Sequence, residues 1–277
     1  MQVLTNIAAI QTEFTNGYIQ ANLNKMRLLV RRCQQKYPHV HFILFPELAV
    51  TGYFLSPRLH ELAENAEGPA YDFMADLSRK HHVYLGYGFV ERGDDPRGDK
   101  KQIYNSFNVI SPNGERLATY QKIHLTPLEK DFFDPGQRLV TIKTEIGNLG
   151  LMICWDLAFP ELARLLVQKG ANVLLAPSAW ELPYDQAYYR FSMARAIDNT
   201  AYLITCNHVG ESSGLRFFGK SAIFYPDGTL LHQADDQDGS IIVSSINLAE
   251  QQKLRFSFYS MSDDRRTDLY TLTWNGE

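Results

Sequence analysis

Cysteine is scarce in this sequence, and its spacing excludes two common uses of the residue. The 277-residue chain has three cysteines, Cys33, Cys154 and Cys206. An odd number of thiols at such wide intervals is a poor basis for a disulfide framework. The chain also lacks a CxxC pair and a tight cluster of histidine and cysteine, so a structural zinc site is not expected. We therefore predict reduced thiols, a cytoplasmic location, and no metal or cofactor.

Long apolar runs and a strong excess of one charge are also missing. No stretch reaches the roughly 18 to 20 apolar residues of a membrane span. The N-terminal segment lacks the positive region and the cleavage site of a signal peptide. The formal net charge is only −4, whereas a nucleic-acid or anionic-membrane partner would favour a basic face. We expect neither kind of partner.

The overall composition is that of an ordinary globular protein. Hydrophobic residues make up 45% of the chain and charged residues 21%, which is enough apolar material for a sizeable core. No linker rich in proline, glycine or serine divides the chain. We predict that residues 1–277 form a single domain.

Short apolar runs alternate with helical patterns along the chain. Two turn signals, Pro-Asn-Gly at 112–114 and Pro-Asp-Gly at 226–228, add antiparallel hairpins. From residue 249 onward the sequence is polar and is predicted to be irregular. This mixture favours an α/β fold with mixed sheets covered by helices, rather than a purely parallel sheet. The predicted strands include 3–12, 41–45, 83–91, 103–111, 115–122, 148–154, 172–178, 201–209 and 240–248, the second hairpin lies within 221–232, and the predicted helices are 17–37, 69–81, 159–169 and 184–199.

Three chemically reactive side chains directly follow such apolar runs. Glu47 comes after HFILFP, Lys122 after LATYQ and Cys154 after LGLMI. The ends of strands in α/β sheets are where loops converge and sites form. Cys154 also lies between a strand and a helix that begins near Phe159, which resembles the logic of a nucleophile elbow. We therefore interpret the three residues as parts of one site.

The three side chains together could activate a thiol. A free thiol has a pKa of about 8.5, so Cys154 needs a base or a positive field to become a good nucleophile. A buried Glu47 would have a raised pKa and could serve as a general base. A buried Lys122 ammonium would lower the thiol pKa and stabilise an oxyanion, and Glu129 could hold the base or the substrate amide. Singly, Cys154 could equally be a small buried hydrophobe, and the other three could be solvated charges.

A series of motifs in the chain resembles the nitrilase superfamily of carbon–nitrogen hydrolases. Seven segments match in order across nearly the whole chain, and Glu47, Lys122 and Cys154 each lie inside one of them. The residue pair Asp198-Asn199 departs from the Glu-Asn that is more frequent in the family. The segments are FPELAVTGY (45–53), YNSFNVISPNGERLATYQKIHL (104–125), EKDFFDPG (129–136), GLMICWDLAFPELAR (150–164), ANVLLAPSAW (171–180), RAIDNTAYLITCNHVG (195–210) and FGKSAIFYPDG (218–228).

The resemblance implies a fold, an activity and a role for each reactive residue. The implied fold is a four-layer α-β-β-α sandwich, assembled as a homodimer or larger homo-oligomer. Glu47 would be the general base, Lys122 the oxyanion stabiliser and Cys154 the nucleophile, with Glu129 in support. The implied reaction is hydrolysis of a small amide or N-carbamoyl compound through a thioester at the cysteine.

The substrate pocket is less clearly marked in the sequence. Tyr53, Phe133, Trp155 and Trp180 could line it, and packing in the core explains these aromatic residues equally well. Arg190 could anchor a carboxylate or lie at the surface. No motif names the acyl group or the leaving amine. Small aliphatic amides, ω-amides of dicarboxylates and N-carbamoyl amines all stay open as substrates.

Several alternatives accompany this interpretation. His124 or His208 could serve a thiol as the base, and Cys206 is a second thiol at a strand end. A nitrilase converting a nitrile to an acid would use the same side chains. The CWDLAFPE run, however, resembles the amidase and carbamoylase branch more than true nitrilases. A non-catalytic binding protein could also keep this fold.

Overall fold

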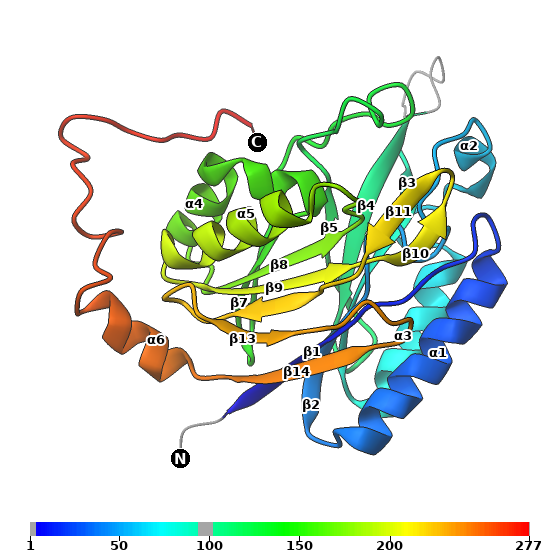
Figure 1. Cartoon of the computed structure of the whole chain (residues 1–277), viewed down its shortest axis with the longest axis horizontal. Helices are drawn as coiled ribbons and strands as arrows, with labels where there is room; N and C mark the ends of the chain where they lie inside the picture. Colours follow the sequence, from blue (N-terminus) through cyan, green and yellow to red (C-terminus); the bar gives the residue numbers. More distant parts are fainter. Residues whose placement is uncertain (1–3, 94–101, 277) are drawn as a thin grey trace.

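The computed structural model describes residues 4–93 and 102–276, and its framework is two six-stranded sheets (Figure 1). In both sheets parallel and antiparallel pairs are mixed. The first sheet has the order β14 (Ile241–Ile246), β1 (Thr5–Ile10), β2 (Val40–Leu44), β3 (Tyr84–Arg92), β4 (Ile103–Ile110), β5 (Arg116–Gln121). The second has the order β13 (Leu230–Gln233), β12 (Ala222–Phe224), β9 (Tyr202–Asn207), β8 (Val173–Ser178), β7 (Gly147–Leu151), β6 (Thr141–Thr144).

The central strands are apolar on both faces because each face packs against a different layer. In β1, Ile7 and Ala9 belong to the core between the two sheets, whereas Ala8 and Ile10 point to the helices outside. This division follows from the period of two in a strand. The thiol of Cys206 in β9 donates to the carbonyl of Leu44 in β2 at 3.3 Å, so the two sheets approach each other closely.

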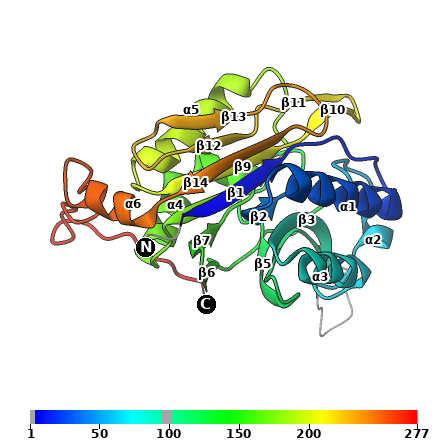
Figure 2. The same cartoon turned by 90° about the horizontal axis from the view of Figure 1, so that it is seen from below.

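Helices cover the outer face of each sheet (Figure 2). α1 (Ile19–Lys36) and α3 (Pro69–His81) pack on the first sheet, where Leu23 and Met26 share a cluster with Ile43. α4 (Pro160–Gln168) and α5 (Asp185–Ile197) cover the second sheet. The result is the predicted α-β-β-α sandwich. The remaining elements are α2 (Leu59–Leu62), the hairpin β10 (Val209–Ser212) and β11 (Leu215–Phe218), α6 (Leu248–Arg255) and a 3₁₀ helix at Cys154–Ala158.

The structure confirms the predicted mixture of elements and corrects the sequence prediction at the C-terminal end. Both predicted hairpins are present as the antiparallel pairs β4–β5 and β12–β13. The predicted irregular tail is wrong at its start, because residues 248–255 form α6. The Asn247 side chain caps this helix by accepting from the amides of Ala249 and Glu250. The strand β6 and the hairpin β10–β11 were not predicted.

The topology brings particular strand ends together. β2, β3 and β5 run in the same direction, because β4 is antiparallel to both β3 and β5. Glu47 and Lys122 therefore follow strands that end at one edge of the first sheet. Cys154 follows β7, which runs parallel to β8 in the second sheet. Within residues 4–93 and 102–276, no helix combines the length and the apolar character that a membrane crossing needs.

Candidate active site

Cys154 occupies a tight turn between β7 and the 3₁₀ helix. Its φ of 49° is in the left-handed region, which is rare for a residue other than glycine. The carboxylate of Asp156 holds this turn by accepting from the Ile153 amide at 2.9 Å. It also accepts from the Tyr120 hydroxyl at 2.7 Å and the His124 amide at 3.1 Å. Asp156, which the sequence did not single out, thus ties the cysteine turn to the segment that carries Lys122.

Glu47 lies in a second constrained turn, just after β2. The next residue, Leu48, has a φ of 47°, and Gly88 on β3 packs directly against the peptide that joins them. The buried His208 ring donates from Nε2 to the Glu47 carbonyl oxygen at 2.5 Å. Burial lowers the pKa of His208 to about 4, so this ring is neutral at pH 7. His208 therefore holds the Glu47 backbone and lacks the free Nε2 of a general base for a thiol.

Lys122 joins the two acidic side chains in a fully buried network. Its ammonium donates to Glu47 Oε1 at 2.7 Å and to both carboxylate oxygens of Glu129 at 2.8 Å. The amide of Thr126 donates to Glu129 Oε2 at 2.9 Å. All three charged side chains are 0% exposed. Such charges are retained in a protein interior when they are paired and hydrogen-bonded, as they are here.

Asn105 is a further member of this network that the sequence reasoning missed. Its side-chain amide donates to Glu47 Oε1 at 2.6 Å and to Glu129 Oε1 at 3.0 Å. The second oxygen of Glu47, Oε2, is buried and has no hydrogen-bond partner among the described residues. Oε1 is thus held by two donors, while Oε2 is left to accept a proton.

The protonation states follow from burial and from these pairs. Burial raises the pKa of Glu47 to about 7, although the Lys122 ammonium opposes the rise. Burial alone would lower the pKa of Lys122, but Glu129 and Glu47 outweigh it and hold that pKa well above its ordinary value. Burial also raises the pKa of the Cys154 thiol, and the Glu47 charge adds to this effect. The thiol is therefore protonated at rest, despite the opposing effect of the nearby ammonium.

A cavity of about 440 Å³ opens onto Cys154. Its walls are mainly apolar, and three of the four predicted pocket residues, Tyr53, Trp155 and Trp180, line it. The fourth, Phe133, is not among the lining residues and is buried in a cluster with Tyr53 and Leu125. The structure adds wall residues that the sequence did not indicate, which are Thr126, Pro127, Leu128, Ala179, Glu181, Tyr184, Ala187, Phe191 and Leu215.

The other residues considered from the sequence lie away from this cavity. Arg190 is exposed on α5, and Cys206 is buried between the sheets. The His124 ring pairs with Asp156 at 2.8 Å and stacks on Phe159. None of these residues lines the cavity.

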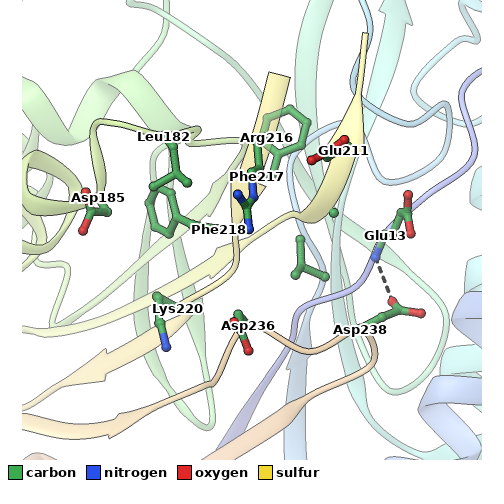
Figure 3. A pocket seen from close by; sticks show the side chains of 12 residues that line it. Glu13, Leu182, Asp185, Glu211, Arg216, Phe217, Phe218, Lys220, Asp236 and Asp238 are labelled. Atoms are coloured by element: carbon green, nitrogen blue, oxygen red, sulfur yellow. Dashed lines mark hydrogen bonds between the residues drawn. The ribbon is translucent and has the colours of Figure 1, made fainter. Parts of the chain in front are cut away.

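A second hollow, of about 480 Å³, lies beside the hairpin β10–β11 and contains none of the predicted site residues (Figure 3). Its lining mixes apolar residues with charged ones, which include Glu13, Glu211, Arg216 and Asp238. The Glu13 amide donates to Asp238 at 2.9 Å across its edge. The two hollows share no lining residue.

Comparison with known proteins identifies the family. The model of the family described as carbon-nitrogen hydrolase matches residues 6–256. The chain belongs to the carbon-nitrogen hydrolase family. A probable nitrilase of Schizosaccharomyces pombe is 36% identical over 269 residues, which are 96% of this chain and 97% of that protein. This carbon-nitrogen hydrolase is thus similar to that relative over almost its whole length.

Solved structures of the family have the same fold. The carbon-nitrogen hydrolase from Helicobacter pylori superimposes with a TM-score of 0.88 at 28% identity, over 97% of each chain. A glutamate-to-glutamine mutant of the amidase from Nesterenkonia has a TM-score of 0.81 at 25% identity, over 96% of this chain and 95% of that one. In that structure the acetamide moiety of fluoroacetamide is covalently added at the active-site cysteine. The chain is an enzyme of the carbon–nitrogen hydrolase class.

Proposed function

We propose that this enzyme hydrolyses the C–N bond of a small amide or N-carbamoyl compound through a thioester at Cys154. The observation that carries the proposal is the buried network of Glu47, Lys122 and Glu129 next to a cavity that opens onto the cysteine. Thiol, carboxylate and ammonium are the three groups that such a reaction needs. The covalent addition at the cysteine of the Nesterenkonia amidase supports the assignment of the nucleophile.

The first half of the reaction forms the thioester. Because the thiol is protonated at rest, its deprotonation accompanies attack on the carbonyl carbon. Glu47, with a pKa of about 7 and an unpartnered Oε2, is suited to take that proton. The Lys122 ammonium and the Trp155 backbone N–H stabilise the oxyanion, each such donor being worth about 10² to 10³ in rate. Glu47 then returns the proton to the leaving nitrogen, which departs as ammonia or an amine.

The second half releases the acid. Glu47, again a carboxylate, takes a proton from water as the water attacks the thioester carbonyl. The proton returns to the departing sulfur, which restores the thiol. The sum is amide plus water to carboxylic acid plus ammonia or amine. Glu129 and Asn105 do not exchange protons in this scheme. Their hydrogen bonds hold the Lys122 and Glu47 side chains in position.

A nitrilase activity is the second candidate, because the relative from Schizosaccharomyces pombe is named a probable nitrilase. The same thiol would add to a nitrile carbon, and two water molecules would be consumed before the acid and ammonia are released. Parallel assays of an amide and of the nitrile with the same carbon chain separate the two activities.

The assembly remains a proposal as well. Large apolar side chains near the C-terminus are exposed, with Phe256 at 78%, Phe258 at 88% and Leu269 at 70%. Their exposure in one copy supports a homodimer or larger homo-oligomer in which this segment is covered. Light scattering of the purified chain tests this directly, and a monomer at micromolar concentration would contradict it.

Ammonia release tests the proposed reaction. A panel of amides, N-carbamoyl compounds and nitriles is assayed with the native enzyme, Cys154→Ala and Cys206→Ala. We expect Cys154→Ala to lose turnover while remaining folded, and Cys206→Ala to keep it, because Cys206 is buried between the sheets. Turnover that survives Cys154→Ala would overturn the assignment of the nucleophile.

A further inference from the structure

The cavity above Cys154 contains one carboxylate that the proposed reaction does not use. Glu181 directly follows Trp180 and lines the cavity. Its backbone is fixed, since it bridges to Phe217 of β11 and its carbonyl accepts from the Tyr184 amide at 3.0 Å. Apart from its own backbone amide, its carboxylate has no hydrogen-bond or ion-pair partner among the described residues. The protein thus positions a carboxylate in the cavity wall without giving it a partner from another residue.

The rest of the cavity wall offers no positive charge to bind an anion. None of the described lining residues is lysine, arginine or histidine. The Lys122 ammonium lies deeper and is already paired with two carboxylates, Glu47 and Glu129. A substrate carboxylate would therefore approach Glu181 without a compensating positive charge, and like charges at such a site repel.

The same wall is well suited to a cation. Trp155, Trp180, Tyr184 and Phe191 surround the cavity, and the faces of aromatic rings attract ammonium groups. A half-buried carboxylate among apolar walls is unfavourable unless it is paired. An ammonium on the substrate would supply the missing partner. Burial raises the pKa of Glu181, and a bound cation would favour the charged form again.

We infer that Glu181 is a specificity-determining residue that selects amides or N-carbamoyl compounds carrying a protonated amine. This inference rests on the proposed function, in which the acyl carbon lies at Cys154. It separates the substrate classes that the sequence left open. Cationic ω-amino amides are favoured, neutral aliphatic amides are accepted, and ω-amides of dicarboxylates are disfavoured.

Matched substrates test the selection. ω-Amino amides of three to six carbons are compared with neutral alkyl amides of equal length and with glutaramate. We expect kcat/KM for the best amino amide to exceed that of its neutral counterpart by at least about tenfold, equivalent to about 1.4 kcal/mol. Glu181→Gln should remove this advantage and leave kcat/KM for the neutral amide within about threefold of the native value. Glu211→Gln, which removes an exposed carboxylate from the second hollow, is the matched control and should change neither value.

An equal loss of kcat/KM on all substrates in Glu181→Gln would overturn the inference. A preference of the native enzyme for glutaramate would overturn it as well. Binding is measured separately by calorimetry with hexylammonium and hexanoate, so that the cation site is tested even without turnover. We expect hexylammonium to bind more tightly than hexanoate, and we expect Glu181→Gln to raise the Kd for hexylammonium about tenfold. Equal binding of the two ions would refute the cation site, whereas selective binding without amide turnover would refute only the proposed reaction.

Discussion

Gly88 provides a sharp test of how the fold positions Glu47, the proposed general base. It lies on β3 beside the turn that carries Glu47. A Cβ atom at this position would lie 2.2 Å from the Leu48 nitrogen and 2.8 Å from the Glu47 carbonyl carbon, both backbone atoms. Since ordinary contacts begin near 3.4 Å, the turn would have to move by about 1.2 Å. Any side chain larger than hydrogen therefore displaces Glu47.

A displacement of this size has a predictable kinetic cost. Misplacing a catalytic group by about 1 Å costs on the order of 10²-fold in rate, and we expect that loss of kcat/KM in Gly88→Ala. Overpacking should also lower the free energy of unfolding by about 1 to 3 kcal/mol. Ammonia release gives the rate, and thermal unfolding shows that the variant is folded at the assay temperature.

Gly86→Ala is the matched control on the same strand. Its added Cβ would meet side-chain atoms of Phe107, Phe42 and Leu44, at 2.9, 3.0 and 3.1 Å, rather than the Glu47 backbone. We expect comparable destabilisation with kcat/KM changed by less than about fivefold. A folded Gly88→Ala with nearly native activity would refute the reasoning, and so would equal losses of activity in both variants.

Three further predictions concern Lys122 and two residues, Asp156 and His208, that hold the turns of Cys154 and Glu47. Lys122→Ala should lose activity and about 3 to 5 kcal/mol of the free energy of unfolding, because two buried carboxylates lose their cation. A variant that is active and fully stable in the same assays would contradict this prediction. Asp156→Asn should lower kcat more than it raises KM, because a donor replaces one of the two carboxylate oxygens that accept from Ile153, Tyr120 and His124 around the cysteine turn. A change in KM alone would argue against that role. His208 has a pKa of about 4 in the folded protein and about 6.5 in the unfolded chain. As pH falls, the unfolded chain therefore binds a proton at His208 before the folded protein does. The free energy of unfolding decreases between about pH 6.5 and pH 4, by up to about 3 kcal/mol. His208→Gln should flatten this part of a urea-denaturation pH profile, and an unchanged slope would show that other groups cause it.

The sequence predicted the three strand-end residues because their signal is local. Each follows a short apolar run, and such runs remain strands in the fold; Glu47 and Lys122 meet because β2 and β5 share a direction. Asn105 could not be found in this way. It lies inside a strand, and only the pairing of β4 with its neighbours brings it to the site. Glu181 belongs to a loop whose path is fixed by the distant hairpin β10–β11.

Some predictions failed or stay untested for equally physical reasons. The start of the tail was predicted irregular because α6 is polar and its apolar periodicity is weak, although Asn247 is a recognisable capping residue. Phe133 was grouped with the pocket because aromatic residues suit both cores and pockets. The ammonium lowers the thiol pKa as expected, but burial, which the sequence does not show, raises that pKa by more. The single domain, the cytoplasmic location and the assembly stay predictions.

The central claim is that the acyl group passes through Cys154 while Glu47 moves the proton. The native enzyme and Glu47→Gln are each mixed with an amide that the native enzyme hydrolyses well, and the reactions are quenched with acid. The peptides of both proteins are then mapped by mass spectrometry. The account predicts an acyl group on the Cys154 peptide that hydroxylamine removes. An acyl group on Cys206 or another side chain, or continued turnover with no acyl-protein in either form, would contradict it.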